Sequence, residues 1–290
     1  MKEADVVMKK PSQFKEIWRR LKKNPTAMIG LVLMLLLVLV AIFADQIVPY
    51  SRATELNIPE RLQGPSAEHW FGTDGYGRDE FARIVHGSRY SLSIGFLSTL
   101  LGLVIGGFLG ILGAYYGGAV DGIIMRIADV LVAIPTILLS LAIVSALGAS
   151  VVILIGAIAF TRIPVFTRVI RSAALNLVNQ DFVEAARAGG TSDLRIIVRH
   201  IIPNAMGTIL VQTTMSVAFV IMQAATLSFL GMGIQAPAPE WGYMLNEARE
   251  FAKNSAYLLW FPGMSIVLSA LSCNLLGDGL RDALDPKLKN

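Results

Sequence analysis

The side chains that could perform acid–base, nucleophilic or metal chemistry are few and scattered along this 290-residue chain. Its histidines are His69, His86 and His200, its only cysteine is Cys273, and their spacing is not that of metal ligands. A Gly-Lys-Ser/Thr sequence that could bind nucleotide phosphates does not occur. We therefore expect no catalytic residue, no metal and no cofactor within this chain.

The charged residues that might suggest chemistry have structural interpretations. Asp74, Asp79 and Glu80 are acidic, but aspartate close to glycine is typical of turns. Three arginines lie near the inner end of a predicted span, where arginine can extend its charge to the membrane interface. They are Arg162, Arg168 and Arg171. A salt-bridge network is expected among Asp121, Arg126 and Asp129.

The densest constellation lies between residues 180 and 204. Asp181 can cap a short helix, and Glu184 in its first turn suits the positive end of the helix dipole. Small alanines give this helix a thin face that could enter a cleft, and a glycine pair ends it. A second short helix over 194–200 precedes the next apolar segment. The candidate site residues are Asp181, Glu184, Ala185, Ala186, Gly190 and Pro203.

Long uncharged segments surround this loop. The chain is 54% hydrophobic and only 16% charged, whereas soluble domains carry about 25% charged residues. A helix needs about 20 apolar residues to cross the hydrocarbon core of a membrane. One uncharged run is too long for a single helix, so we divide it at residues 147–150 and predict six spans. They are residues 27–44, 92–115, 123–147, 151–169, 205–230 and 257–277.

The distribution of lysine and arginine orients these spans. Residues 1–26 hold eight basic residues against three acidic ones, which predicts a cytoplasmic N-terminal tail. Counting spans then places residues 45–91 outside, and residues 180–204 and the tail 281–290 inside. The basic pI of about 9.2 thus reflects membrane topology. No nucleic-acid partner is expected.

Two predicted spans carry different stripes. In the second span a small residue recurs at every fourth position, which favours close helix packing in lipid over a ligand role. These residues are Ser98, Gly102, Gly106 and Gly110, followed by Ala114. In the fifth span, polar side chains share one face that either forms interhelical hydrogen bonds or lines a hydrophilic passage. They are Thr208, Gln212, Ser216, Gln223 and Thr226.

Flanking segments are expected at the membrane surfaces. Residues 13–23 could form an amphipathic helix on the inner leaflet, and a solvated basic anchor is an equal alternative. Residues 78–88 predict a helix along the outer surface, with three charged residues off its apolar face. Those charged residues are Arg78, Glu80 and Arg83. Trp241 and Tyr243 are typical of interfacial anchors.

The loop at 180–204 resembles the Glu-Ala-Ala loop of permease subunits of ATP-binding-cassette (ABC) importers. Glu184-Ala185-Ala186 is followed after three residues by Gly190, and twelve residues separate Gly190 from Pro203, as in that family. His200 departs from the general pattern, which often has isoleucine there. Further stretches are similar to the peptide and nickel branch of the family. They are residues 69–79, 117–135, 227–242 and 274–286.

The resemblance covers nearly the whole chain and implies an all-α membrane protein with six transmembrane helices. The implied architecture is the type I ABC importer permease fold with both termini in the cytoplasm. In it, residues 27–44 form the first transmembrane helix and residues 45–91 an external loop with a surface helix. Residues 92–280 form the permease core, which includes the coupling loop 180–204.

The resemblance also implies a set of partners in a bacterial or archaeal plasma membrane. They are a second homologous permease, two ATPase subunits that carry ATP and Mg²⁺, and an external substrate-binding protein. The implied cargo is a dipeptide or oligopeptide, with nickel or a metal chelate as the alternative.

Two other classes of protein are weighed against this interpretation. An ion-coupled secondary carrier would need an ionisable residue within a span, and no predicted span centre carries a convincing one. A receptor or scaffold would leave the loop at 180–204 unexplained. The permease interpretation accounts for more of the sequence than either.

Overall fold

The computed structural model describes residues 13–284, with side chains from residue 17 onward. Helices supply the regular structure of this part of the chain, which holds no strand and a single isolated β-bridge between Thr73 and Asp79. The all-α fold expected from the sequence is confirmed. Expectations for residues 1–12 and 285–290, which include parts of both predicted tails, lie outside the described residues.

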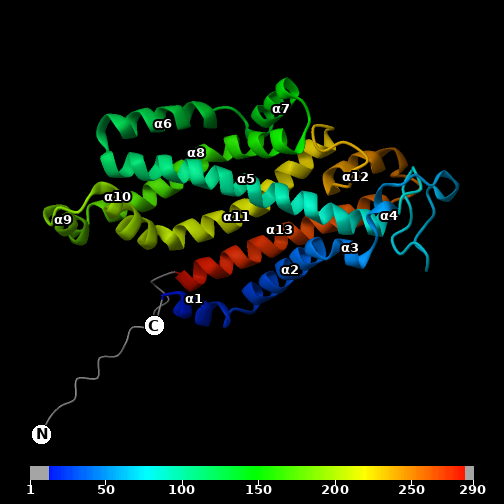
Figure 1. Ribbon diagram of the computed structural model, residues 1–290, viewed down its shortest axis with the longest axis horizontal. Coiled ribbons are helices and arrows are strands. Elements are labelled where there is room, and N and C mark those ends of the chain that lie inside the picture. The colour runs from blue at the N-terminus through cyan, green and yellow to red at the C-terminus, as the bar shows by residue number, and fades with distance from the viewer. Residues whose placement is uncertain (1–12, 285–290) are drawn as a thin grey trace, which may run out of the picture.

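Five long helices lie side by side along the molecule (Figure 1). They are α2 (Pro25–Ile42), α5 (Glu80–Tyr116), α8 (Val151–Val178), α11 (Ile202–Phe229) and α13 (Tyr257–Leu284). The shorter helices are α1 (Gln13–Leu21), α3 (Ala44–Ile47), α4 (Tyr50–Thr54), α6 (Gly118–Val132), α7 (Thr136–Leu147), α9 (Asp181–Ala188), α10 (Asp193–Ile196) and α12 (Trp241–Ala248). Short 3₁₀ or π turns are η1 (Ile58–Glu60), η2 (Ile197–Ile201) and η3 (Arg249–Phe251).

Each of the five long helices is long and apolar enough to cross a membrane. α6 and α7 reach that length only together, and they are bent by 85° at the break between them. The structure therefore has six spans if this bent pair counts as one, and the predicted continuous helix over 123–147 is wrong. Pro135 lies at the break. It interrupts the helix because it has no backbone N–H to donate and because it disfavours helical geometry at the preceding Ile134.

α5 is one helix of 37 residues, so the predicted surface helix over 78–88 and the predicted second span belong to a single element. Asp79 begins it, because its carboxylate accepts a hydrogen bond of 2.8 Å from the backbone N–H of Ala82. α5 ends at Gly117, whose φ of +60° suits glycine. Its first turns are buried against α4 and α12.

The contact between α5 and α8 forms the centre of the bundle. A Cβ atom added at Gly106 would lie 2.5 Å from the carbonyl oxygen of Ile163, and one at Gly110 would lie 2.5 Å from that of Thr167. Glycine at these positions lets the two backbones approach closely. α11 packs against α13, α5 and α8, and α2 packs against α13.

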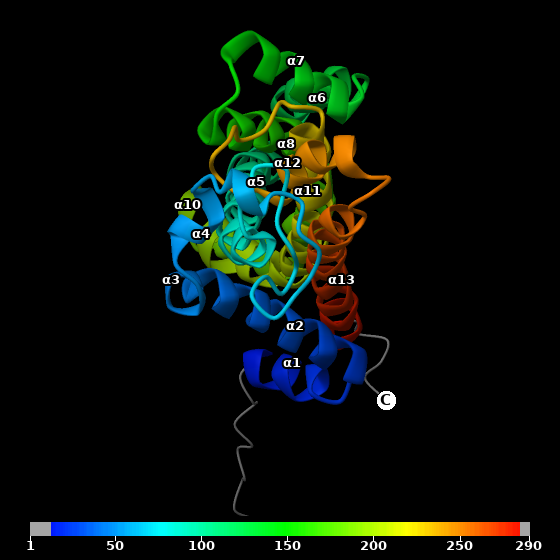
Figure 2. The ribbon, with the colours of Figure 1, turned by 90° about the vertical axis from the view of Figure 1, so that its right-hand side faces the viewer.

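α1 lies beside the end of α13 (Figure 2). Leu21 is buried there, close to Gly279. Trp18 is 38% exposed, and the ammonium group of Lys22 lies 5.1 Å from the centre of its ring. α1 therefore contacts the bundle through the apolar Leu21, while its tryptophan faces outward.

Candidate functional site

α9 and α10 form a helix–turn–helix at one end of the molecule, the left end in Figure 1. Gln180 occupies the N-cap position of α9, so Asp181 is the first helical residue and not the cap that the sequence predicts. Asp181 and Glu184 lie in the first turn, where the helix dipole favours negative charge. α9 ends at Gly189, and the following Gly190 has a φ of +73°, which side-chain-bearing residues rarely adopt.

A small apolar contact attaches α9 to the bundle. Val183 is completely buried and belongs to the cluster of apolar side chains that joins α5, α8 and η2. The hydroxyl of Tyr115 donates a hydrogen bond of 2.7 Å to Asp193 of α10. The guanidinium carbon of Arg187 lies 4.8 Å from the centre of the Tyr115 ring. A displacement of α9 would therefore reach α5, α8 and, through η2, α11.

The other face of α9 is open. Glu184 and Ala185 are exposed and Ala186 is half-buried, so the triplet presents a carboxylate and small side chains outward. Leu194 of α10 is 72% exposed. Pro203 lies in the first turn of α11, where the missing N–H is tolerated. The segment 180–204 thus offers a narrow projecting surface.

The three arginines of α8 differ in their surroundings. Arg171 forms an ion pair with Asp121, and Arg168 donates to Asp129 at 2.5 Å. Asp121 and Asp129 thus form ion pairs as the sequence predicts, and their partners are arginines of α8, which ties α8 to α6. Arg162 is only 7% exposed and lies near the middle of α8, so the predicted extension of its charge to the membrane interface is wrong.

The structure divides the predicted polar face of α11. Ser216 accepts a hydrogen bond of 3.0 Å from Arg162, and Gln223 donates one of 3.0 Å to Ser140 of α7. Ser216 and Gln223 are buried, and they tie α11 to α8 and α7. The other members are half-buried or exposed: Thr208, Gln212 and Thr226.

A buried charge network lies at the opposite end of the molecule, near α4 and α12 in Figure 1. Arg78 donates to Asp74 at 2.6 Å and to Glu247 of α12 at 2.8 Å. Arg83 of α5 donates to the same Glu247 at 2.5 Å and also to Asp74. Arg78, Glu80 and Arg83 are each at most 2% exposed. The prediction that these three charges lie off the buried face is therefore wrong.

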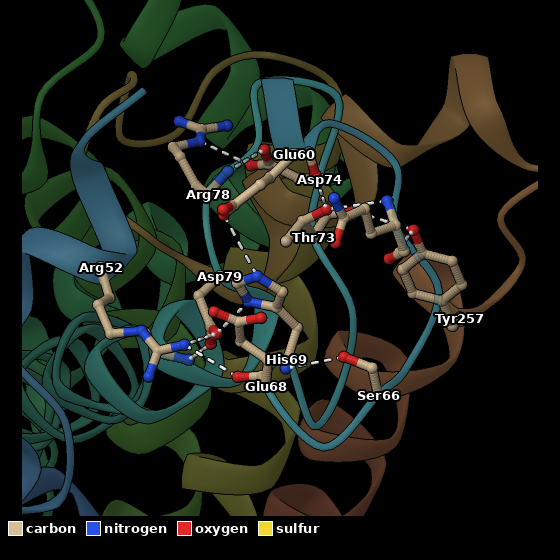
Figure 3. A network of polar contacts seen from close by, with 12 residues as sticks. Arg52, Glu60, Ser66, Glu68, His69, Thr73, Asp74, Arg78, Asp79 and Tyr257 are labelled. Carbon is tan, nitrogen blue, oxygen red and sulfur yellow. Dashed lines mark hydrogen bonds and ion pairs between the residues drawn. The ribbon is translucent and has the colours of Figure 1, made fainter. Parts of the chain in front are cut away.

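Part of this network could be found from local spacing. Asp74 and Arg78 are four residues apart, which is a common separation for an ion pair on a turn or helix. Glu247 is 169 residues from Arg78, and no local pattern indicates that partner. The long segment before α5 is also tied to this end (Figure 3). The carboxylate of Asp79 accepts a hydrogen bond of 2.8 Å from the guanidinium group of Arg52, and Nδ1 of His69 lies 2.9 Å from the same carboxylate.

Glu240 and Trp241 fix α12 against α5. The Glu240 carboxylate accepts hydrogen bonds from the backbone N–H of Gly242 at 3.0 Å and from the hydroxyl of Ser91 at 3.1 Å. Burial nevertheless raises the pKa of Glu240. Trp241 is 1% exposed, and its indole N–H donates to the carbonyl of Ile84 at 3.0 Å. Trp241 is thus a core residue and not the interfacial anchor that the sequence predicts.

Across the described residues, no group of three or more His, Cys, Asp or Glu side chains is arranged to hold a metal ion. The two features that stand out are the projecting α9 at one end and the polar side chains between α8 and α11.

Known proteins resemble this chain over most of its length. Residues 102–290 match the family described as binding-protein-dependent transport system inner membrane component, and residues 12–65 match the N-terminal transmembrane domain of oligopeptide transport permease C. The dipeptide transport system permease protein DppC of Alkalihalophilus pseudofirmus is 47% identical, over 96% of this chain and 91% of its own length. The glutathione transport system permease protein GsiD of Escherichia coli is 46% identical, over 97% and 94%.

The fold also has a counterpart among solved structures. A chain of the MetNI methionine ABC transporter, solved in inward-facing conformations, matches with a TM-score of 0.59 at 18% sequence identity. The match covers 70% of this chain and 97% of that one. With its apolar helices, the chain is a multi-pass membrane protein of the ABC importer permease fold. It belongs to the family of binding-protein-dependent transport system inner membrane components, the permease subunits of ABC importers.

Proposed function

We propose that this permease carries peptides, from dipeptides to oligopeptides, as part of an ATP-driven importer. Relatives at 47% and 46% identity are named as dipeptide and glutathione permeases, and the N-terminal region matches a domain of an oligopeptide permease. Dipeptides and glutathione share amide bonds and a free carboxylate. One pathway could therefore serve this class of cargo.

α9 is the proposed docking element for a separate ATPase subunit. The observation that carries this proposal is the contrast between its two faces, with Val183 fully buried and Glu184 and Ala185 exposed. Small residues let the helix enter a groove, and the sequence holds no phosphate-binding loop of its own. When the ATPase pair closes, α9 would move, and Val183 would pass that movement to the ends of the long helices.

The proposed orientation puts α9 in the cytoplasm and the network of Asp74 and Glu247 on the outer side. It rests on the excess of lysine and arginine in the N-terminal tail. An external binding protein would then deliver peptide at the end that holds the network. A second permease would complete the passage, because six spans alone hardly enclose a path for a polar peptide.

The polar face of α11 is the proposed lining of that passage. Gln212 is half-buried and Thr226 is exposed, so both could meet cargo without rearrangement. Cysteine placed at either position should react with a water-soluble thiol reagent in the assembled transporter. Protection of both positions would support a purely structural role for this face.

Uptake by the complete transporter tests the proposed function. The chain is reconstituted into proteoliposomes with its second permease, ATPases and external binding protein, and labelled dipeptide or nickel is supplied. We expect accumulation of dipeptide that requires hydrolysable ATP. Accumulation that persists without the ATPases and follows an ion gradient would contradict the importer. Accumulation of nickel without peptide would contradict the cargo.

A further inference from the structure

Arg162 is a buried positive charge without an acidic partner. It lies near the middle of α8 and faces Ser216 near the middle of α11. Among the side chains that the structure describes, no carboxylate lies within ion-pair distance of Arg162, whereas Arg168 and Arg171 on the same helix both have aspartate partners. Burying an unpaired charge within a membrane is costly, so such a residue is expected to serve function.

The guanidinium group of Arg162 has hydrogen-bonding capacity to spare. It carries five N–H donors. One Nη2 donor reaches the hydroxyl of Ser216 at 3.0 Å, and the buried Nε has no partner. The amide of Gln212 approaches the same hydroxyl at 3.4 Å. The acceptor best matched to the fork of donors on arginine is a carboxylate, which accepts two parallel hydrogen bonds.

Two aromatic rings cover the guanidinium group. The centre of the Phe219 ring lies 4.8 Å from its central carbon, and that of Phe166 lies 6.0 Å away. Phe166 is fully buried, but Phe219 is 46% exposed. A cation–π contact is weaker than a hydrogen-bonded ion pair, so an arriving carboxylate can displace Phe219. Rotation of one exposed side chain would uncover the charge.

We propose that Arg162 receives the free carboxylate of the peptide as it passes the middle of the bundle, with Phe219 as a movable cover. This inference rests on the peptide transport proposed above. A carboxylate from the second permease is the other way to neutralise the charge. Such a permanent partner would have to lie where Phe219 now lies, whereas an aromatic cover suits a carboxylate that arrives and leaves.

The first test compares arginines of one helix in the complete transporter. The maximal rate of dipeptide uptake is measured at saturating external binding protein. R162Q should lower this rate roughly tenfold or more, and R162K, which keeps the charge but not the fork, should lose less. The control R168Q removes the same charge from a half-exposed pair outside the proposed site and should stay within about twofold of wild type. An R162Q rate equal to that of R168Q would overturn the proposal.

The second test separates contact with cargo from a structural role. With Phe219→Cys, labelling by a water-soluble maleimide during turnover should be slowed by dipeptide. In the double variant that combines Phe219→Cys with R162Q, the same dipeptide should not slow the labelling. Protection that is absent, or unchanged by R162Q, would overturn the proposal. Loss of the second permease on purification of R162Q would also overturn it, because Arg162 would then meet that partner.

The outcome for the wild-type transporter is informative by itself. Wild-type complex that accumulates no peptide would contradict the proposed function and this inference together. Wild-type uptake with no effect of R162Q on rate or on labelling would contradict only the role of Arg162.

Discussion

The two ends of the bundle are built in opposite ways. At one end, Arg78 and Arg83 are buried with Asp74 and Glu247, and this network cross-links α5, α12 and the segment before α5. At the other end, α9 is attached mainly by Val183 and has an exposed outer face. The charge network holds the helices at its end in fixed relative positions, whereas α9 presents a surface that a partner could bind and displace.

The difference has an energetic basis. A buried charge network tolerates little displacement, because a charge that loses its partner remains away from water. An apolar contact such as that of Val183 is non-directional and can slide without leaving an unpaired group. We therefore expect substitutions at the network end to affect stability, and substitutions at the α9 end to affect coupling.

Removing an arginine from the network has the largest expected effect. Arg83→Met leaves Asp74 and Glu247 with one cation in place of two, and breaking a buried ion pair costs about 3–5 kcal/mol. Thermal unfolding of the purified chain in detergent measures the loss. The control Arg168→Met acts on a pair whose side chains are 41% and 63% exposed and should cost at most about 1 kcal/mol. Equal losses would erase the proposed contrast.

The helix pair that connects the two ends should tolerate added volume only where space exists. Gly110→Val would place a Cβ 2.5 Å from the carbonyl oxygen of Thr167 in α8, and overpacking of this kind costs about 1–3 kcal/mol. Gly156→Val is the matched control, because nothing lies within 4 Å of a Cβ at that glycine. The same unfolding measurement compares them. A control as damaging as Gly110→Val would argue against close α5–α8 packing.

The attachment of α10 should respond to one hydroxyl. Tyr115→Phe removes the hydrogen bond of 2.7 Å to Asp193, which is worth about 0.5–1.5 kcal/mol. Hydrogen exchange should become faster in α9 and α10 and stay unchanged in α12. Faster exchange throughout the chain would mean that the two ends are not independent.

The features that the sequence predicts correctly are local ones. The apolar helices follow from uncharged runs, and the turn after α9 follows from Gly189 and Gly190, whose backbone geometry depends on neighbouring residues alone. The break at Pro135 is also local, yet the apolar run across it conceals the bend.

The features that the sequence misses depend on partners far along the chain. Arg78 and Arg83 resemble surface charges until Glu247 of α12 is placed beside them. Trp241 resembles an interfacial anchor until α5 covers it. Arg162 resembles a charge near the membrane interface until Ser216 and Phe219 are brought over it. Spacing along one helix holds no information about these contacts.

The smallest expected effect on stability belongs to the residue with the largest expected effect on coupling. Glu184 is exposed and contributes no packing, so Glu184→Lys should change the free energy of unfolding by no more than about 1 kcal/mol, through the helix dipole. Gly190→Asp places a side chain at a φ of +73° and should distort the turn between α9 and α10. Membrane insertion should survive in both variants.

The ratio of peptide taken up to ATP hydrolysed tests the role of α9 most directly. It is measured in proteoliposomes that hold the complete transporter, with wild-type chain, Glu184→Lys or Gly190→Asp. We predict that both variants assemble and hydrolyse ATP but lose most of their uptake, because movement of the ATPases no longer reaches the long helices. A wild-type ratio in both variants would contradict the proposal that α9 couples the ATPase to transport.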